Sequence, residues 1–172
     1  MTGLARREKE LYNSRIIDAY IKLLKTRYHG VKIGDILQYA GMKGYEVADQ
    51  SHWFTQEQID RFYEKTVELT GNPQIAREAG RYSASPEAMG AMRQYILGMV
   101  GPIHAFGLVR RTSTKFTRSS LYDSRPLSPN RVEVTVTPFE GVTEKPFQCE
   151  NRIGFFEAVC MMSVSYTHLR AH

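Results

Sequence analysis

The side chains best suited to acid–base or metal chemistry are sparse in this chain of 172 residues. Its two cysteines, Cys149 and Cys160, would need two further ligands at a matching spacing to hold a structural zinc ion, and the sequence does not supply them. GxSxG, HExxH, CxxC and glycine-rich phosphate-binding motifs are missing from it as well. We therefore expect a domain that is not an enzyme, holds no metal and has two ordinary, partly buried thiols. The sequence leaves its cofactor, if any, unknown.

The longest stretch without a formal charge, residues 94–109, is the better candidate for a functional segment. Its three glycines leave space between larger apolar side chains, which is the usual setting of a small-molecule site. The expected ligand-binding residues are Tyr95, Met99, Ile103, His104 and Phe106. A plain core segment with a kink at Gly101-Pro102 explains the same pattern equally well. His104 stands in apolar company here, and a buried histidine bonded to the backbone is favoured over a haem ligand.

Positive charge is concentrated in residues 110–131 of a chain whose formal net charge is +5. Only Asp123 opposes the basic side chains there, which are Arg110, Arg111, Lys115, Arg118, Arg125 and Arg131. An exposed basic hairpin at 110–131 would suit a nucleic-acid-binding regulator, and this is the alternative function. Few aromatic side chains lie between the charges, so a solvated face or a face for an acidic partner is favoured, and nucleic acid is the weaker expectation.

The first hundred residues are predicted to be helical, because apolar side chains recur at helical spacing and capping residues divide the segments. The expected helices are one from Leu11 closed by His29-Gly30, one at 33–40 ended by Gly41, one from the Thr55 cap through Leu69 and ended by Gly71, one opened by Asn72-Pro73 and ended by Gly80, and one from Pro86 to about Met99. The apolar stripe at residues 11–24 also permits a homodimer surface.

The second part of the chain changes character and predicts an α+β fold. Residues 112–121 look extended, residues 124–130 look like a turn, and residues 131–137 alternate with three valines on one face, as in a half-exposed strand. Residues 149–162 return to helical spacing. We expect a helical N-terminal half packed on an antiparallel β-hairpin, followed by a C-terminal helix. No stretch is long enough to span a membrane, and the charged N-terminus is unlike a signal peptide, so the expected location is cytoplasmic.

Residues 164–172, with the sequence VSYTHLRAH, resemble the translated adapter read-through that ends some metagenomic gene models. We therefore take residues 1–163 as the domain, expect it to be incomplete at its C-terminus, and set residues 164–172 aside as a non-native tail.

Several segments together resemble the N-terminal input domain of bacterial multidomain sensor proteins, which precedes PAS, histidine kinase or diguanylate cyclase modules. These segments are GDIL and AG within 34–41, HWFT at 52–55 with Phe62, TGN at 70–72, AREAGR at 76–81 and PFQCENRIG at 146–154. The pattern is similar to vinyl-reductase-like small-molecule-binding domains, and more distantly to haem nitric-oxide-binding domains and TRAPP transport-complex subunits. The resemblance covers about residues 14 to 162. It implies a domain of a two-component or related signalling protein that senses a small molecule for a covalently attached output module.

Two departures from these families shape the functional expectation. The vinyl-reductase-like group usually ends with a glycine- and cysteine-containing hairpin after the helix that begins near Arg152, where this chain runs into residues 164–172 instead. The haem-binding relatives use a Tyr-x-Ser-x-Arg triad. Residues 122–125 read Tyr-Asp-Ser-Arg, so the residue between the serine and the arginine is missing. On a strand this places Arg125 on the opposite face from Ser124. We therefore expect a small apolar or aromatic ligand, whose contacts along 95–106 shift the packing of the two halves and move the terminal helix.

Overall fold

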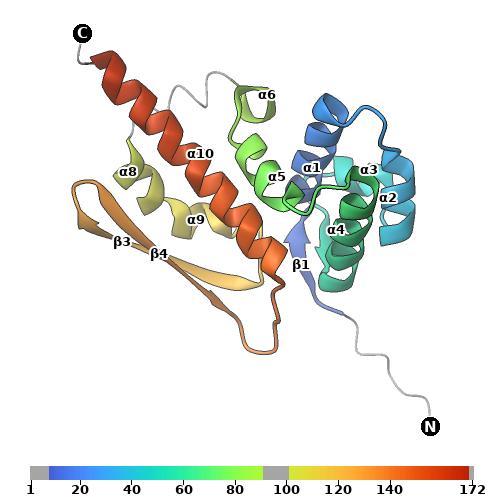
Figure 1. Cartoon of the computed structure of the whole chain (residues 1–172). Helices are drawn as coiled ribbons and strands as arrows, with labels where there is room; N and C mark the ends of the chain where they lie inside the picture. The colour runs from blue at the N-terminus through green and yellow to red at the C-terminus, as the bar shows by residue number, and fades with distance from the viewer. Residues whose placement is uncertain (1–7, 91–100, 171–172) are drawn as a thin grey trace.

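The computed structural model describes residues 8–90 and 101–170 of the chain. Over these ranges the fold is α+β, with a helical half, an antiparallel hairpin and a C-terminal helix, as the sequence predicts. Figure 1 shows the helical half beside the hairpin half, with the long C-terminal helix lying across the hairpin. The elements before residue 90 are β1 (Glu10–Asn13), α1 (Ser14–Arg27), α2 (Ile33–Ala40), α3 (Gly44–Ala48), β2 (Trp53–Thr55), α4 (Gln56–Thr70), α5 (Ile75–Ser83) and α6 (Pro86–Met89).

The first helix begins three residues later than the apolar spacing predicts, since Leu11 lies in β1. Asn13 stops the strand and caps the helix: its Oδ1 accepts from the backbone N–H of Arg15 at 3.1 Å. The Nδ2 of Asn13 donates to the carbonyl oxygens of Gln50 and His52, at 3.0 and 3.2 Å. Asn13 is therefore buried with its polar atoms paired, and α1 starts at a fixed point beside β2.

Glycines end two helices as predicted and have another role in a third. Gly41 and Gly71 follow α2 and α4 with φ of +66° and +65°, the left-handed conformation typical of a helix C-terminus. Gly80 was expected to end α5, but that helix runs on to Ser83. A Cβ atom on Gly80 would overlap the carbonyl oxygen of Asn151 in the C-terminal helix. Gly80 thus serves a close helix crossing, and the expected stop is wrong.

The helix expected from Pro86 to Met99 is observed as α6, over Pro86–Met89, with Gly90 following it. Gly90 is not helical, with φ of +84°, so the expected unbroken helix to Met99 is wrong at that residue. Residues 91–99 lie outside the described residues.

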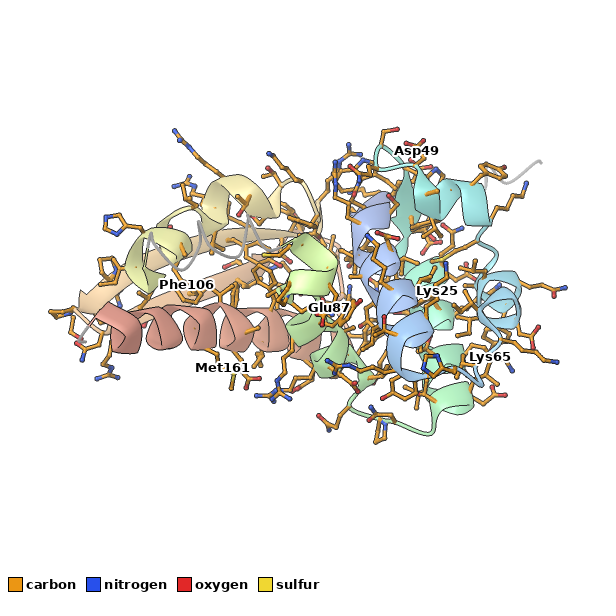
Figure 2. The ribbon with its side chains drawn as sticks, turned by 90° about the horizontal axis from the view of Figure 1, so that it is seen from above. Lys25, Asp49, Lys65, Glu87, Phe106 and Met161 are labelled. Carbon is orange, nitrogen blue, oxygen red and sulfur yellow. The ribbon has the colours of Figure 1, made fainter. Side chains whose placement is uncertain are left out.

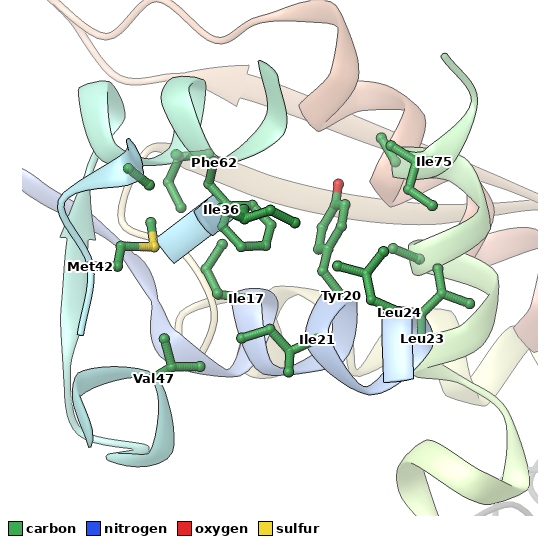
Figure 3. Packing of buried hydrophobic residues seen from close by; sticks show 14 of the residues in the cluster. Ile17, Tyr20, Ile21, Leu23, Leu24, Ile36, Met42, Val47, Phe62 and Ile75 are labelled. Atoms are coloured by element: carbon green, nitrogen blue, oxygen red, sulfur yellow. The ribbon is translucent and has the colours of Figure 1, made fainter. Parts of the chain in front are cut away.

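The helical half has its own hydrophobic core (Figure 3). α1 supplies the largest share, and its apolar side chains pack on α2, α4 and α5. The side chains that α1 buries in this core are Ile17, Tyr20, Ile21, Leu23 and Leu24. The stripe that suggested a dimer surface is therefore covered within the chain itself.

The hairpin half differs from the sequence expectation at its start. Its elements are α8 (Pro102–Gly107), α9 (Val109–Ser113), β3 (Ser120–Ser128), β4 (Arg131–Pro138) and α10 (Pro146–Arg170). Of residues 112–121, expected to be extended, 112 and 113 belong to α9, 114–116 form a turn, and β3 begins only at residue 120. The expected turn at 124–130 is mostly β3. The alternating strand is confirmed, because the three valines of β4 are half-buried and their neighbours are exposed.

Backbone contacts join the two halves next to β1. Tyr12 forms an antiparallel bridge with Thr117, just before β3. The N–H of Arg118 donates to the carbonyl oxygen of Leu11 at 2.7 Å, and the N–H of Asn13 donates to that of Phe116 at 2.9 Å. The β1–β2 and β3–β4 pairs are thus linked through residues 116–118. Among the described helices, none combines the length and the apolar content that crossing a membrane requires.

Candidate ligand-binding site

A second apolar cluster lies between the β3–β4 hairpin, α8 and α10, and it also includes Ala84 after α5 and Met89 of α6 (Figure 2). Its buried members are Ala84, Phe106, Val109, Tyr122 and Val159. Its partly buried members are Met89, Ala105, Val132, Val134, Val136, Phe155, Phe156 and Ala158. Within the described residues, partly buried members outnumber buried ones, the reverse of the first core. This is the part of the fold to which the sequence assigned ligand binding.

Only some of the predicted site residues reach this cluster. Phe106 does: it is 6% exposed, and its ring lies edge-to-face with that of Phe156 at a centroid distance of 5.4 Å. Ile103 is half-buried on α8. His104 is exposed, so it does not stand in the apolar company that the sequence suggested.

The other two predicted ligand-binding residues, Tyr95 and Met99, lie outside the described residues.

Three aromatic residues of this cluster were not predicted. Phe155 and Phe156 come from α10, and Tyr122 comes from the inward-facing side of β3. The sequence pattern of each segment does mark these residues as inward-facing. Residues 155, 156 and 159 share one helix face, and Tyr122 lies between two exposed strand residues. Nothing in those local patterns shows that the two segments meet Phe106.

The hairpin also shows why the haem triad does not form. The hydroxyl of Ser124 points inward and donates to the carbonyl oxygen of Phe106 at 2.7 Å. Arg125 points outward, where its guanidinium pairs with Glu133 at 2.9 Å. Consecutive strand residues face opposite ways, so the expected separation of Ser124 from Arg125 is confirmed.

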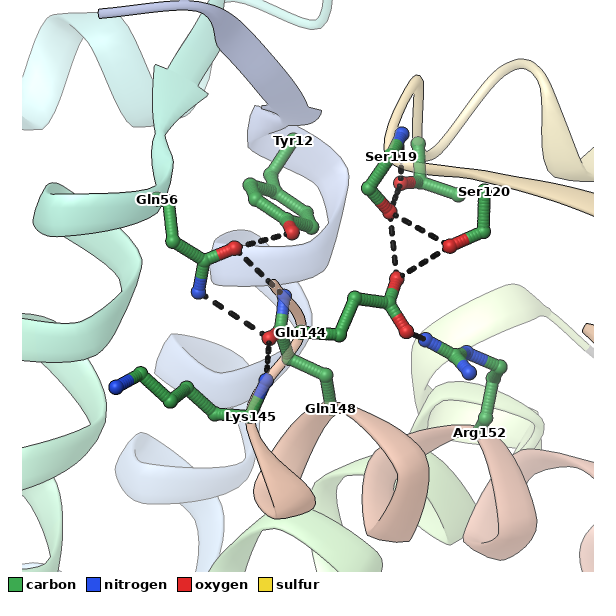
Figure 4. Close-up of polar contacts among 9 residues, drawn as sticks. Tyr12, Gln56, Ser119, Ser120, Glu144, Lys145, Gln148 and Arg152 are labelled. Atoms are coloured by element: carbon green, nitrogen blue, oxygen red, sulfur yellow. Dashed lines mark hydrogen bonds and ion pairs between the residues drawn. The ribbon is translucent and has the colours of Figure 1, made fainter. Parts of the chain in front are cut away.

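A buried polar group fixes the chain just before α10 (Figure 4). The Glu144 carboxylate accepts from the hydroxyls of Ser119 and Ser120 at 2.6 and 2.7 Å and forms an ion pair with Arg152. Burial raises the pKa of Glu144, but the hydrogen bonds from Ser119, Arg152 and Ser120 outweigh it and hold the pKa below its usual value. The Arg152 guanidinium also lies 5.4 Å from the ring centroid of Tyr122. Arg152 therefore ties α10 to β3.

A second set of hydrogen bonds in Figure 4 ties the start of α10 to the helical half. The Tyr12 hydroxyl donates to the side-chain oxygen of Gln56, and the Gln56 Nε2 donates to Gln148 Oε1 at 3.2 Å. The same Gln148 oxygen accepts from the Lys145 N–H at 2.6 Å. Gln148 is buried, so its position in α10 is determined by β1 and α4.

The main contact between α10 and the helical half is the crossing of α5 with α10. Gly80 and Gly154 face each other there: a Cβ on Gly154 would overlap the carbonyl oxygen of Arg77, as one on Gly80 would overlap that of Asn151. Asn151 Nδ2 donates to the carbonyl oxygen of Ala76 at 3.0 Å. Two glycines without side chains therefore bring the two helix backbones into direct contact.

The basic residues of 110–131 do not form one hairpin surface. Arg110 and Arg111 lie on α9, and the hairpin begins only at residue 120. Arg118 stacks on Trp53, with 3.7 Å from its Cζ to the ring centroid, and Arg125 is paired as described. The expectation of a single basic hairpin is therefore wrong, because these residues belong to three different structural contexts.

Both cysteines are free thiols, but both residues are exposed, whereas partly buried thiols were expected. Within residues 8–90 and 101–170, no group of histidine, cysteine, aspartate and glutamate is arranged to hold a metal ion.

Comparison of the chain with family models, curated proteins and solved structures gave no match.

Proposed function

We propose that this chain is a small-molecule-sensing regulatory input domain of a bacterial signal-transduction protein. A small apolar or aromatic molecule binds in the second cluster, next to Phe106, and α10 passes the signal to a covalently attached output domain, of the histidine kinase or diguanylate cyclase type. The domain itself performs no chemistry in this proposal. The sequence resemblance supports the role as a sensory input domain, and the position of α10 supports this helix as the element that passes the signal to the output domain.

The observation that carries the proposal is that one helix belongs to both halves. On one face α10 contributes Phe155, Phe156 and Val159 to the second cluster. Through Gly154 the same helix touches the backbone of α5. A molecule that inserts beside Phe156 must therefore change either the hairpin packing or the angle between α5 and α10.

The mechanism follows from the different packing of the two clusters. The first core is filled by buried side chains, whereas the second consists mainly of half-buried ones in the described residues. When a ligand covers partly exposed apolar side chains, binding is favoured by about 25 cal/mol for each Å² of apolar surface removed from water. A ligand that binds one arrangement of α10 better than another shifts the free-energy difference between the two arrangements by at most the difference between its two binding free energies.

A thermal-shift screen against small aromatic and lipid-like compounds tests the proposal. A ligand at 100 times its Kd should stabilise the domain by about 2.7 kcal/mol, which is a readily measured rise in Tm. The variant Phe106→Leu keeps an apolar side chain but removes the ring that contacts Phe156. We expect it to lose most of the ligand-induced shift.

The matched control is Phe147→Leu. Phe147 is likewise in an aromatic pair, with its ring stacked on Tyr63 at 4.1 Å, but it is half-buried and packs against the first core. This variant should keep the ligand-induced shift. Uniformly null shifts across the screen, or equal losses in both variants, would contradict a site next to Phe106.

A further inference from the structure

A polar groove of about 620 Å³ lies in the helical half, apart from the second cluster. It is lined by Arg27, Gln74, Arg77, Glu78, Arg81, Tyr82 and Ser85. Its size falls within the range of small-molecule sites. Three arginines and one glutamate line it, and the carboxylates of Glu150 and Glu157 on α10 pair with Arg77 and Arg81 beside it, so an anionic ligand would bind these arginines in competition with those carboxylates.

Arg27 is held only weakly by the protein and is 52% exposed. Its Nη1 lies 3.3 Å from Glu78, while that carboxylate also accepts from the Tyr28 hydroxyl at 2.7 Å and from Asn72 Nδ2 at 3.0 Å. Tyr28 and Asn72 both bond to Oε2 of Glu78, whereas Arg27 makes a single, longer contact with Oε1. The Arg27 guanidinium sits 5.8 Å from the ring centroid of Tyr82, which holds it over the groove and leaves most of its donors for a ligand.

Arg81 reaches the same groove from α5 and is 51% exposed. Its Nε and Nη2 both donate to one oxygen of Glu157, at 2.8 and 2.7 Å. The Glu157 carboxylate is also the partner of Arg77. One carboxylate on α10 therefore serves two guanidiniums, and an anion in the groove would compete with Glu157 for Arg81.

We propose that this groove binds a phosphorylated small molecule, with Arg27 and Arg81 as its main contacts, and that binding weakens the hold of Arg81 on Glu157 of α10. Guanidinium groups that approach from α1 and from α5 suit a tetrahedral phosphate, whose oxygens accept from several directions. This inference goes beyond the apolar site, because none of the groove residues belongs to the second cluster.

Calorimetric titration of the whole chain with inorganic pyrophosphate tests the site. The wild type should bind one pyrophosphate per chain, and Arg27→Gln and Arg81→Gln should each weaken binding at least ten-fold. Glu157→Gln should bind several-fold more tightly, because it removes the competing charge and leaves Arg81 in place. That gain cannot come from a variant that has simply lost its fold.

Arg125→Gln is the matched control, since Arg125 is also an exposed, ion-paired arginine but lies on the hairpin. Its affinity for pyrophosphate should equal that of the wild type. Equal weakening by Arg125→Gln and Arg27→Gln would reveal nonspecific attraction to a basic protein and overturn the site. Tighter binding of citrate than of pyrophosphate would overturn the assignment to phosphate, and an unchanged Kd in Glu157→Gln would overturn the competition with α10.

Discussion

Replacing Gly154 with alanine should lower the free energy of unfolding by about 3 kcal/mol, at the upper end of the usual cost of overpacking. The added methyl group would overlap the carbonyl oxygen of Arg77, which belongs to the α5 backbone and cannot rotate away. The two helices would have to separate, and the hydrogen bond from Asn151 to Ala76 would be lost with the contact. Urea unfolding followed by circular dichroism measures the loss.

The control for this substitution is Gly34→Ala in α2. A Cβ on Gly34 meets nothing within 4 Å, and its backbone is helical, so alanine should stabilise the chain by up to about 1 kcal/mol. Opposite signs at the two positions would show that the crossing, and not glycine itself, sets the cost. A Gly154→Ala variant as stable as the wild type would contradict a close contact between α5 and α10.

Replacing Arg152 with methionine should also cost about 3 kcal/mol at neutral pH, because it leaves the Glu144 carboxylate charged and largely buried without its cation. The side chains of Arg152 and Glu144 are 17% and 11% exposed, so water compensates little. Arg125→Met breaks an exposed pair with Glu133 and should cost less than about 1 kcal/mol. Urea unfolding of both variants at pH 7 separates the two cases.

The pH dependence of the Arg152→Met effect has a definite sign. The pKa of Glu144 is lowered in the folded wild type, so its contribution is present above the unfolded pKa and is lost as the pH falls below it. In the variant that pKa should rise, because burial persists without the ion pair. The stability difference between the two proteins should therefore shrink as the pH is lowered from 7 to 4. A difference that is constant with pH would show that Glu144 and Arg152 are not coupled.

Elements set by local chemistry could be predicted from the sequence. Thr55 and Gln58 form the expected capping box at the start of α4, and Gly71 ends that helix, because both signals act within a few residues. In β4, the alternation of valines with polar residues predicted which side chains face inward, because this pattern is also local.

Features that depend on distant partners could not be predicted. Gly80 looks like any glycine at a helix end until Asn151 is seen to lie against it. In the same way, Phe106 was recognised from its apolar neighbourhood, but its partner Phe156 belongs to α10, a helix that follows the hairpin in the sequence, 50 residues further along. The basic run at 110–131 was a pattern in sequence only, since the fold distributes its charges over α9, a loop and the hairpin.

The claim that α10 moves when a ligand binds is tested most directly by the distance between α2 and α10 near Cys160, measured with and without ligand. Spin labels on Cys160 and on Gln38→Cys, two exposed positions, report it in a Cys149→Ser background. With the compound that stabilises the domain most in the screen, we predict a shift of the distance distribution toward a second position of α10, and no such shift in Phe106→Leu. An unchanged distribution at saturating ligand would contradict a role for α10 in relaying the signal.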